Sequence, residues 1–203
     1  IVAMVDPNPQ VAGQGLKRLE QAGIKTASGL MQAEARALNL GFLSHMERQR
    51  PYVRVKLASS LDGRTAMRSG ESVWITGEAA RRDVQFWRAQ AGAIVTGIGT
   101  VLADDPSLNI RLTASELAIQ GEVRQPLRVI LDSQLQIPLE AKLFKLAGQV
   151  AIYTSSHNQD KIAQLQQMGV QVYPFPHAPL DLNAVLSALT QAGINEIHVE
   201  AGA

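Results

Sequence analysis

From residue 52 onward, short runs of β-branched and aliphatic residues alternate with helical stretches, and this alternation restricts the fold more than any other feature. The predicted strands cover 52–58, 93–97, 127–132, 149–154, 170–173 and 196–200, and the predicted helices cover 77–91, 158–168 and 181–192. Several of the strand segments contain no charged residue, which is typical of strands buried on both faces of a parallel sheet. The sequence therefore predicts an α/β fold with a mostly parallel sheet and flanking helices.

The first 50 residues are organised differently. The pattern there predicts a strand, a helix, a short strand and a longer helix, at 1–5, 15–22, 24–27 and 31–48. The longer helix ends before Pro51, because the residue that precedes a proline resists the helical conformation. We therefore expect a domain boundary near 47–51, with one domain at 1–46 and a second at 47–203.

Composition and charge exclude several classes of function. Of the 203 residues 46% are hydrophobic and 18% charged, and the net charge of +1 gives no basic field for binding nucleic acid. No apolar run is long enough to span a membrane, and the N-terminus lacks the basic segment of a signal peptide, so we expect a cytoplasmic protein. Position 1 is Ile rather than Met, which indicates a piece of a longer chain.

Metal binding is not expected either. The chain contains no cysteine, which excludes disulfides and every cysteine-ligated metal site. The four histidines lie more than five residues apart, so no local pair of ligands exists. His198 lies between Ile197 and Val199, and we expect it to pack in the interior or against a neighbouring helix.

Four polar segments directly follow predicted strands: 59–77, 96–106, 132–133 and 200–202. A parallel sheet brings such segments to one edge, and open parallel sheets bind ligands outside the carboxyl ends of their strands. This edge is the predicted functional site. Within the first segment Asp62 and Gly63 fit a tight turn, with Ser59, Ser60 and Arg64 placed to hold it.

Two short motifs in these segments have two interpretations each. Gly97-Ile98-Gly99 resembles the start of a dinucleotide fingerprint, but Leu102 stands where that pattern needs a third glycine. A strand-to-helix turn with positive φ is the favoured interpretation, although a glycine pair also lets the backbone approach a phosphate. Asp104-Asp105-Pro106 could form a turn or an acid/base pair; we favour the turn for Asp105 and leave Asp104 open.

Three side chains remain ambiguous when each is taken alone. Arg88 and Arg111 could each hold a phosphate or carboxylate through two parallel hydrogen bonds, whereas an exposed surface arginine is the usual case. Trp74 is more often a core residue than a platform for a ligand.

Several motifs together resemble the reductase domain of the bifunctional riboflavin-biosynthesis deaminase/reductases. They are 55–66 (VKLASSLDGRTA), 70–76 (GESVWIT), 104–108 (DDPSL) and 199–202 (VEAG), and 6–15 (DPNPQVAGQG) resembles the tail of the deaminase domain. The resemblance runs in order over essentially the whole chain. The first two blocks are its most specific part.

The resemblance implies a dihydrofolate-reductase-like fold and NADPH-dependent reduction of 5-amino-6-(5-phosphoribosylamino)uracil to its ribityl form. By the family's pattern the cofactor would contact Ala58, Trp74, Thr100, Asp104, Ser133 and Gly202. The substrate would contact Ser72, Arg88, Leu108, Arg111 and Glu200, with the two arginines on its 5-phosphate. Catalytic roles would fall to Asp104, Lys56 and Glu200, with Lys56 aiding proton transfer.

The chain departs from the family pattern in two places. The His-x-Glu and Pro-Cys-x-x-Cys segments of a zinc deaminase are absent, so 1–46 resembles the C-terminal remnant of a cytidine-deaminase-like domain, with zinc only in the missing part. The glycine loop that would hold the NADPH diphosphate is cut at Ala203. We therefore expect the isolated chain to be weakly active or inactive, and the full-length protein to be a homo-oligomer.

Two other functions fit parts of the sequence. The first is another NADPH-dependent reductase of the same fold that acts on a different heterocycle, which would not need a deaminase-like tail. The second is a non-catalytic nucleotide-binding α/β module, which would have no reason to keep Ser72, Arg88, Asp104, Arg111 and Glu200 together.

Overall fold

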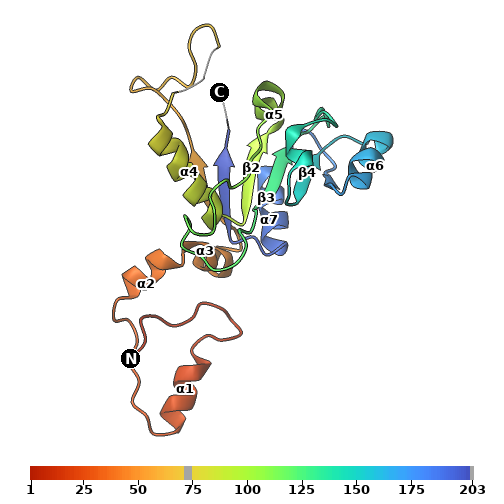
Figure 1. The fold of residues 1–203 in the computed structure, drawn as a ribbon. Helices are drawn as coiled ribbons and strands as arrows, with labels where there is room; N and C mark the ends of the chain where they lie inside the picture. Colours follow the sequence, from red (N-terminus) through yellow and green to blue (C-terminus); the bar gives the residue numbers. More distant parts are fainter. Residues whose placement is uncertain (71–74, 202–203) are drawn as a thin grey trace. The chain divides into compact units, whose positions relative to one another are not determined.

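A computed structural model of the chain describes residues 1–70 and 75–201 (Figure 1). The chain divides into two compact units. The first comprises Ile1–Tyr52 and Leu186–Asn195, and the second comprises Val53–Val185 and Glu196–Ala203. Among the described residues, no helix combines the length and the apolar character that crossing a membrane requires.

The first unit is mainly helical. It contains α1 (Gln14–Gln21), α2 (Gln32–Leu38), α3 (Leu40–Arg48) and the end of α7 (Leu182–Gln191). The single helix predicted at 31–48 is wrong, because Asn39 adopts φ −126° and ψ 33° and separates α2 from α3. The strands predicted at 1–5 and 24–27 are reduced to one bridge between Val2 and Ser28, since two isolated short strands have too little support to extend.

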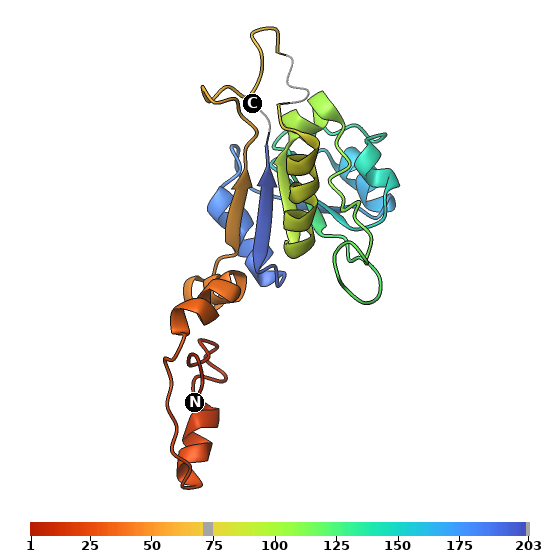
Figure 2. The ribbon, with the colours of Figure 1, turned by 60° about the vertical axis from the view of Figure 1, so that its left-hand side comes forward.

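The second unit contains a six-stranded sheet in the order β1-β6-β2-β3-β4-β5. Its strands are β1 (Tyr52–Lys56), β2 (Ala93–Gly97), β3 (Leu127–Leu131), β4 (Val150–Thr154), β5 (Gln171–Pro174) and β6 (Glu196–Glu200). The pairings from β6 through β2, β3 and β4 to β5 are all parallel. Figure 2 shows β1 beside β6, pointing the same way. The predicted α/β fold with a mostly parallel sheet is confirmed.

The remaining helices of this unit are α4 (Glu78–Gln90), α5 (Ile98–Asp104), the 3₁₀ turn η1 (Lys142–Lys145) and α6 (Gln159–Gln167). α4 packs against β6, α5 against β2 and α6 against β5. The sequence pattern did not predict α5, because seven residues with an internal glycine show too little periodicity. η1 was also not predicted.

Buried side chains cover both faces of the sheet, and one large hydrophobic cluster lies on the face that carries Ile94. Ile94, Ile130 and Ile152 are fully buried in adjacent strands and pack with α5, α6 and η1. Burying each such side chain contributes roughly 2 kcal/mol. His198 is aligned with Ile94 in the β2–β6 register and is likewise buried. Side chains two residues apart share a face of a strand, so Glu200 extends this same face to the carboxyl edge of β6.

Candidate functional site

A cavity of about 560 Å³ opens at the carboxyl ends of β1 and β6. Its volume falls in the range that small-molecule sites occupy. It lies at the carboxyl edge of the sheet, outside the ends of these strands, which is the usual place for a ligand in an open parallel sheet. The residues used below that line it are Lys56, Ala58, Thr76, Arg81, Arg88, Thr100, Asp104, Asp105, Leu108, Arg111, Lys142 and Glu200.

A buried ion pair forms one wall of the cavity. Nε and an NH2 nitrogen of Arg88 donate to the two carboxylate oxygens of Glu200, at 2.5 and 2.8 Å. The remaining guanidinium nitrogen of Arg88 donates to the carbonyl oxygen of Asn109 at 2.8 Å. Only about a tenth of each paired side chain is exposed, 11% for Arg88 and 12% for Glu200. Such two-point pairing fixes the orientation of a carboxylate as well as its charge.

Arg88 keeps Glu200 ionised, and burial keeps His198 neutral. Burial acts to raise the pKa of Glu200, but the hydrogen bonds and charge of Arg88 outweigh it and leave that pKa below its ordinary value. Burial lowers the pKa of His198, whose Nε2 lies 3.6 Å from Oε1 of Glu200. The positive charge of Lys56 acts on both groups in the same direction. The edge of β6 therefore presents one fixed carboxylate to the cavity.

α5 carries two of the predicted cofactor contacts. Thr100 and Asp104 stand one helical turn apart, and both line the cavity. Asp105 ends the helix with φ 40°, and its carboxylate accepts a hydrogen bond from the Lys142 backbone N–H at 2.8 Å. This arrangement supports the turn interpretation of Asp105 and leaves Asp104 facing the cavity.

The backbone angles at the start of α5 do not require glycine at positions 97 and 99. Gly97 has φ −88°, and Gly99 is also outside the positive-φ region, so the expected turn with positive φ is wrong in its conformation. Apart from its chain neighbours and the backbone of its own helix, a Cβ added at either glycine would meet no atom of residues 1–70 and 75–201 within 4 Å. Neither strain nor packing requires glycine here. The open space against this backbone fits the close approach of a phosphate-bearing cofactor.

The loop after β1 supplies a further wall. Asp62 accepts hydrogen bonds from the Ser60 hydroxyl and from Arg64 Nε, and Gly63 has φ 78°. The predicted turn is therefore present, although Ser59 makes no bond to it within the described part of the chain. Further along the loop, Thr65, Ile75 and Thr76 line the cavity.

The cavity brings together some, but not all, of the predicted site residues. The cavity collects Lys56, Ala58, Arg88, Thr100, Asp104, Leu108, Arg111 and Glu200. Ser133 is not among the lining residues, and its carbonyl oxygen accepts from the Ser155 backbone N–H at 3.0 Å. Ser72, Trp74 and Gly202 lie outside the described residues. Within residues 1–70 and 75–201, no three His, Asp or Glu side chains converge as metal ligands would.

Sequence reasoning missed three residues of this region. Arg81 lines the cavity and donates to the Thr76 carbonyl oxygen at 2.5 Å, and Lys142 lines it from η1. Gln85 is buried in α4 and accepts from the Arg111 backbone N–H at 2.9 Å. A polar residue at a buried helical position, one turn before Arg88, was the only available signal for Gln85.

The comparisons with known proteins agree with this geometry. Residues 51–203 match the family described as the RibD C-terminal domain. The riboflavin biosynthesis protein RibD of Escherichia coli K12 is 44% identical over 207 residues, which cover 100% of this chain and 56% of that protein. The chain thus spans about half the length of the curated relatives it matches.

Two solved structures are similar to this chain over nearly its whole length. RibD of Acinetobacter baumannii superposes with a TM-score of 0.83 at 44% identity, over 100% of this chain and 54% of the other. A diaminohydroxyphosphoribosylaminopyrimidine deaminase/5-amino-6-(5-phosphoribosylamino)uracil reductase of Thermotoga maritima superposes with a TM-score of 0.80 at 30% identity, over 99% and 53%.

Proposed function

The chain belongs to the RibD C-terminal domain family, and from that premise we propose that it carries the reductase site of a bifunctional riboflavin-biosynthesis enzyme. The reaction is the NADPH-dependent reduction of 5-amino-6-(5-phosphoribosylamino)uracil, in which the ribosyl group becomes a ribityl chain. The observation that carries the proposal is the cavity at the carboxyl edge of the sheet, with a fixed carboxylate on one wall and α5 on another. The deaminase chemistry is proposed to lie in a part of the protein outside this chain.

NADPH supplies the hydride when it is bound. The room against Gly97 and Gly99, together with Thr100 and Asp104 on the cavity side of α5, suits its binding. Ala58 at the end of β1 would contact it as well. The roles assigned to Trp74, Ser133 and Gly202 stay predictions from the resemblance.

The chain's own residues then have three tasks. Glu200 is held ionised by Arg88 and can accept hydrogen bonds from substrate hydroxyl or amine groups. Opening the sugar ring releases its ring oxygen, which must take up a proton, and Lys56 stands at the cavity end of β1 as the proposed donor. Arg111 is proposed to bind the 5-phosphate, with Ser72 and Leu108 as further substrate contacts.

The contacts of Arg88 favour a role different from the one expected. Arg88 was predicted as a phosphate clamp, but all three of its side-chain nitrogens already donate to Glu200 or to Asn109. The side chain of Arg111, by contrast, is exposed and has no ion-pair partner within residues 1–70 and 75–201. We therefore assign most of the phosphate recognition to Arg111, and to Arg88 the task of orienting Glu200.

Assay of the full-length protein tests the proposal. Incubation with NADPH and the phosphoribosylaminouracil should consume NADPH, seen as falling absorbance, and yield a product heavier by two hydrogens in mass spectrometry. An absence of NADPH oxidation with this substrate, or equal oxidation with an unrelated heterocycle such as a dihydropterin, would overturn it. The isolated chain should turn over far more slowly than the full-length protein.

The proposal also fixes the expected partners. The substrate is a small pyrimidine ribosylamine phosphate, and no nucleic-acid or membrane partner is expected. A cytoplasmic location and a homo-oligomeric state are proposed for the full-length protein. Sedimentation of that protein would measure the oligomeric state directly.

A further inference from the structure

Side chains, rather than neighbouring backbone, hold residues 109–111. The Asn109 carbonyl oxygen accepts from Arg88 at 2.8 Å. The Gln125 side chain accepts from the Ile110 N–H at 2.9 Å and donates to the Ile110 carbonyl oxygen at 3.2 Å. Gln85 accepts from the Arg111 N–H at 2.9 Å. Three consecutive residues of this loop are thus tied to two glutamines and an arginine.

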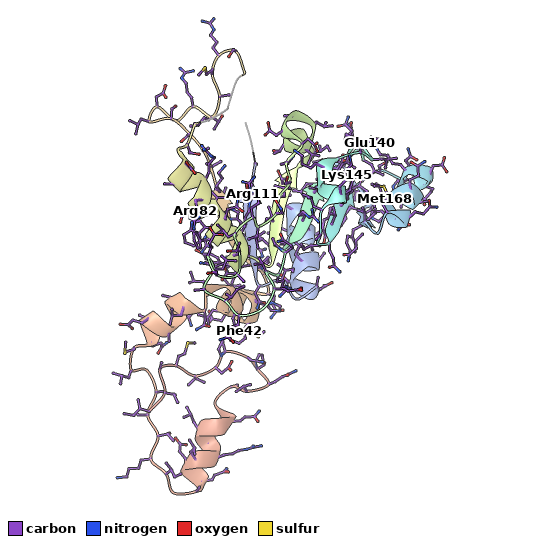
Figure 3. The ribbon with its side chains drawn as sticks, viewed as in Figure 1. Phe42, Arg82, Arg111, Glu140, Lys145 and Met168 are labelled. Carbon is purple, nitrogen blue, oxygen red and sulfur yellow. The ribbon has the colours of Figure 1, made fainter. Side chains whose placement is uncertain are left out.

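This loop begins at a strained residue. Leu108 has φ 47°, which is unfavourable for a leucine, and its side chain is buried in the core. Such conformations persist only where the surrounding structure over-determines them. The buried Leu108 fixes one end of the loop, and the side-chain hydrogen bonds fix residues 109–111. Arg111, which is labelled in Figure 3, is the last of these three residues.

Gln85 and Arg88 belong to the same rigid element. They stand three residues apart in α4, so both side chains leave one face of the helix. Arg88 reaches the Glu200 carboxylate and Asn109, while Gln85 reaches the Arg111 backbone. One turn of helix therefore sets the spacing between the fixed carboxylate and the base of the Arg111 side chain. Gln85 is well shielded from solvent, with an exposed fraction of only 5%.

We propose that Gln85 is a positioning residue that holds the backbone of Arg111, so that the Arg111 guanidinium meets the substrate's phosphate at a set distance from Glu200. The proposal rests on the proposed function, because it assumes that Arg111 binds that phosphate. It concerns substrate affinity rather than chemistry, since Gln85 touches neither the reacting carbon nor the predicted cofactor contacts.

The test replaces Gln85 with a residue of similar shape that lacks the amide. Gln85→Met keeps the length and the helix propensity but leaves the Arg111 N–H without an oxygen acceptor. In the full-length protein we expect the KM for the phosphoribosylaminouracil to rise about tenfold, with kcat and the KM for NADPH within about twofold. Gln90→Met is the matched control, because Gln90 is exposed at the end of the same helix.

A double-mutant comparison separates positioning from a general structural effect. Arg111→Ala alone should raise the substrate KM, and adding Gln85→Met to it should then change that KM by less than about twofold. An equal factor in both backgrounds, or an unchanged KM in Gln85→Met alone, would overturn the proposal. An unchanged KM in Arg111→Ala would also overturn it, because the phosphate role of Arg111 would be lost.

Amide hydrogen exchange gives a readout that does not need activity. The Arg111 amide should be protected in the unmodified protein and should exchange faster in Gln85→Met, but not in Gln90→Met. An unprotected Arg111 amide in the unmodified protein overturns the proposal even if the variant fails to fold. A protein with no reductase activity whose Arg111 amide behaves as expected would instead count against the proposed function alone.

Discussion

Two acidic residues at the carboxyl edge of one sheet are used in opposite ways. Asp132 directly follows β3 and is fully buried, and its carboxylate oxygens accept from the backbone N–H groups of Gln136 and Ile137 at 2.9 and 2.8 Å. Glu200 ends β6, and its carboxylate binds Arg88, a side chain 112 residues distant. The first carboxylate closes a local turn, whereas the second is held at the wall of a cavity.

The difference lies in where each carboxylate finds its partners. Backbone N–H groups a few residues away bind both oxygens of Asp132, and the side chain is fully buried. Glu200 is oriented by a guanidinium from another element and remains ionised, with part of its surface toward the cavity. An acid at the end of a strand is therefore a candidate for chemistry when its partner is distant in sequence, and a turn residue when its partner is local.

Replacing Asp132, the acid with local partners, should give the largest effect, and this effect should be a loss of stability. Asp132→Ala leaves the backbone N–H groups of Gln136 and Ile137 without acceptors, at a cost of about 1–3 kcal/mol for each one that is buried. We expect the free energy of unfolding in urea to fall by about 3 kcal/mol. The kcat and substrate KM of the folded fraction should hardly change, and a large loss of kcat would contradict the comparison.

Replacing Glu200, the acid whose partner is distant in sequence, should affect activity more than stability. Glu200→Gln keeps the shape of the side chain but removes the charge that Arg88 and the substrate would share. We expect kcat/KM for the aminouracil to fall by about 100-fold, which corresponds to about 2.7 kcal/mol. Glu196→Gln is the matched control on the same strand, because Glu196 pairs with Arg54 at 3.9 Å and does not line the cavity. Equal losses in both variants would remove the special role of Glu200.

Acid should destabilise the fold, because His198 and Glu200 both have lowered pKa values in the folded chain. Burial lowers the pKa of His198. Below the ordinary value of 6.5 the unfolded chain therefore binds more protons than the folded chain. The free energy of unfolding consequently decreases as the pH decreases. The lowered pKa of Glu200 acts in the same direction at lower pH, below its ordinary value of 4.5.

His198→Leu should therefore flatten the dependence of the unfolding midpoint on pH between about 7 and 5. The matching change at the exposed His157 is the control. A profile that stays equally steep in His198→Leu would show that other groups carry the effect.

The smallest expected effect tests the glycine at the head of α5. Gly99→Ala places a methyl group in space that the described residues leave open, and alanine favours a helix over glycine by up to about 1 kcal/mol. We expect a slightly higher unfolding free energy together with a several-fold higher KM for NADPH. Gly15→Ala in α1 is the matched control, because it has the same open surroundings and should leave that KM unchanged. An unchanged KM in Gly99→Ala would remove the argument for close approach of the cofactor.

Much of the second unit could be predicted because its signals are local. The strands are short runs rich in aliphatic and β-branched residues, and the structure places them within a residue or two of their predicted bounds. The break at Asn39 could not be predicted, since a helical pattern continues across it. α5 was missed because its propensity is low and its position depends on β2, against which it packs.

The site, like the fold, could be predicted only in part from the sequence. Asp104 and Glu200 were visible as acids in segments that follow strands, Arg111 as an arginine able to hold a phosphate, and Lys56 through the family resemblance. Their relations were not, because the pairing of Arg88 with Glu200 and the bond from Arg111 to Gln85 join residues 112 and 26 positions apart. For this reason the role proposed for Arg88 differs from the phosphate contact first expected of it.

The sequence by itself determined the class of fold and the edge of the sheet where chemistry can occur, since strand periodicity and the residues after each strand are local properties. Only the tertiary structure decided which charged groups neutralise one another and which remain open to a ligand. That outcome depends on the order β1-β6-β2, which brings β6, the last strand of the described chain, between the first two. The free energy that selects this order comes from burying side chains distant in sequence, and no short stretch of sequence contains it.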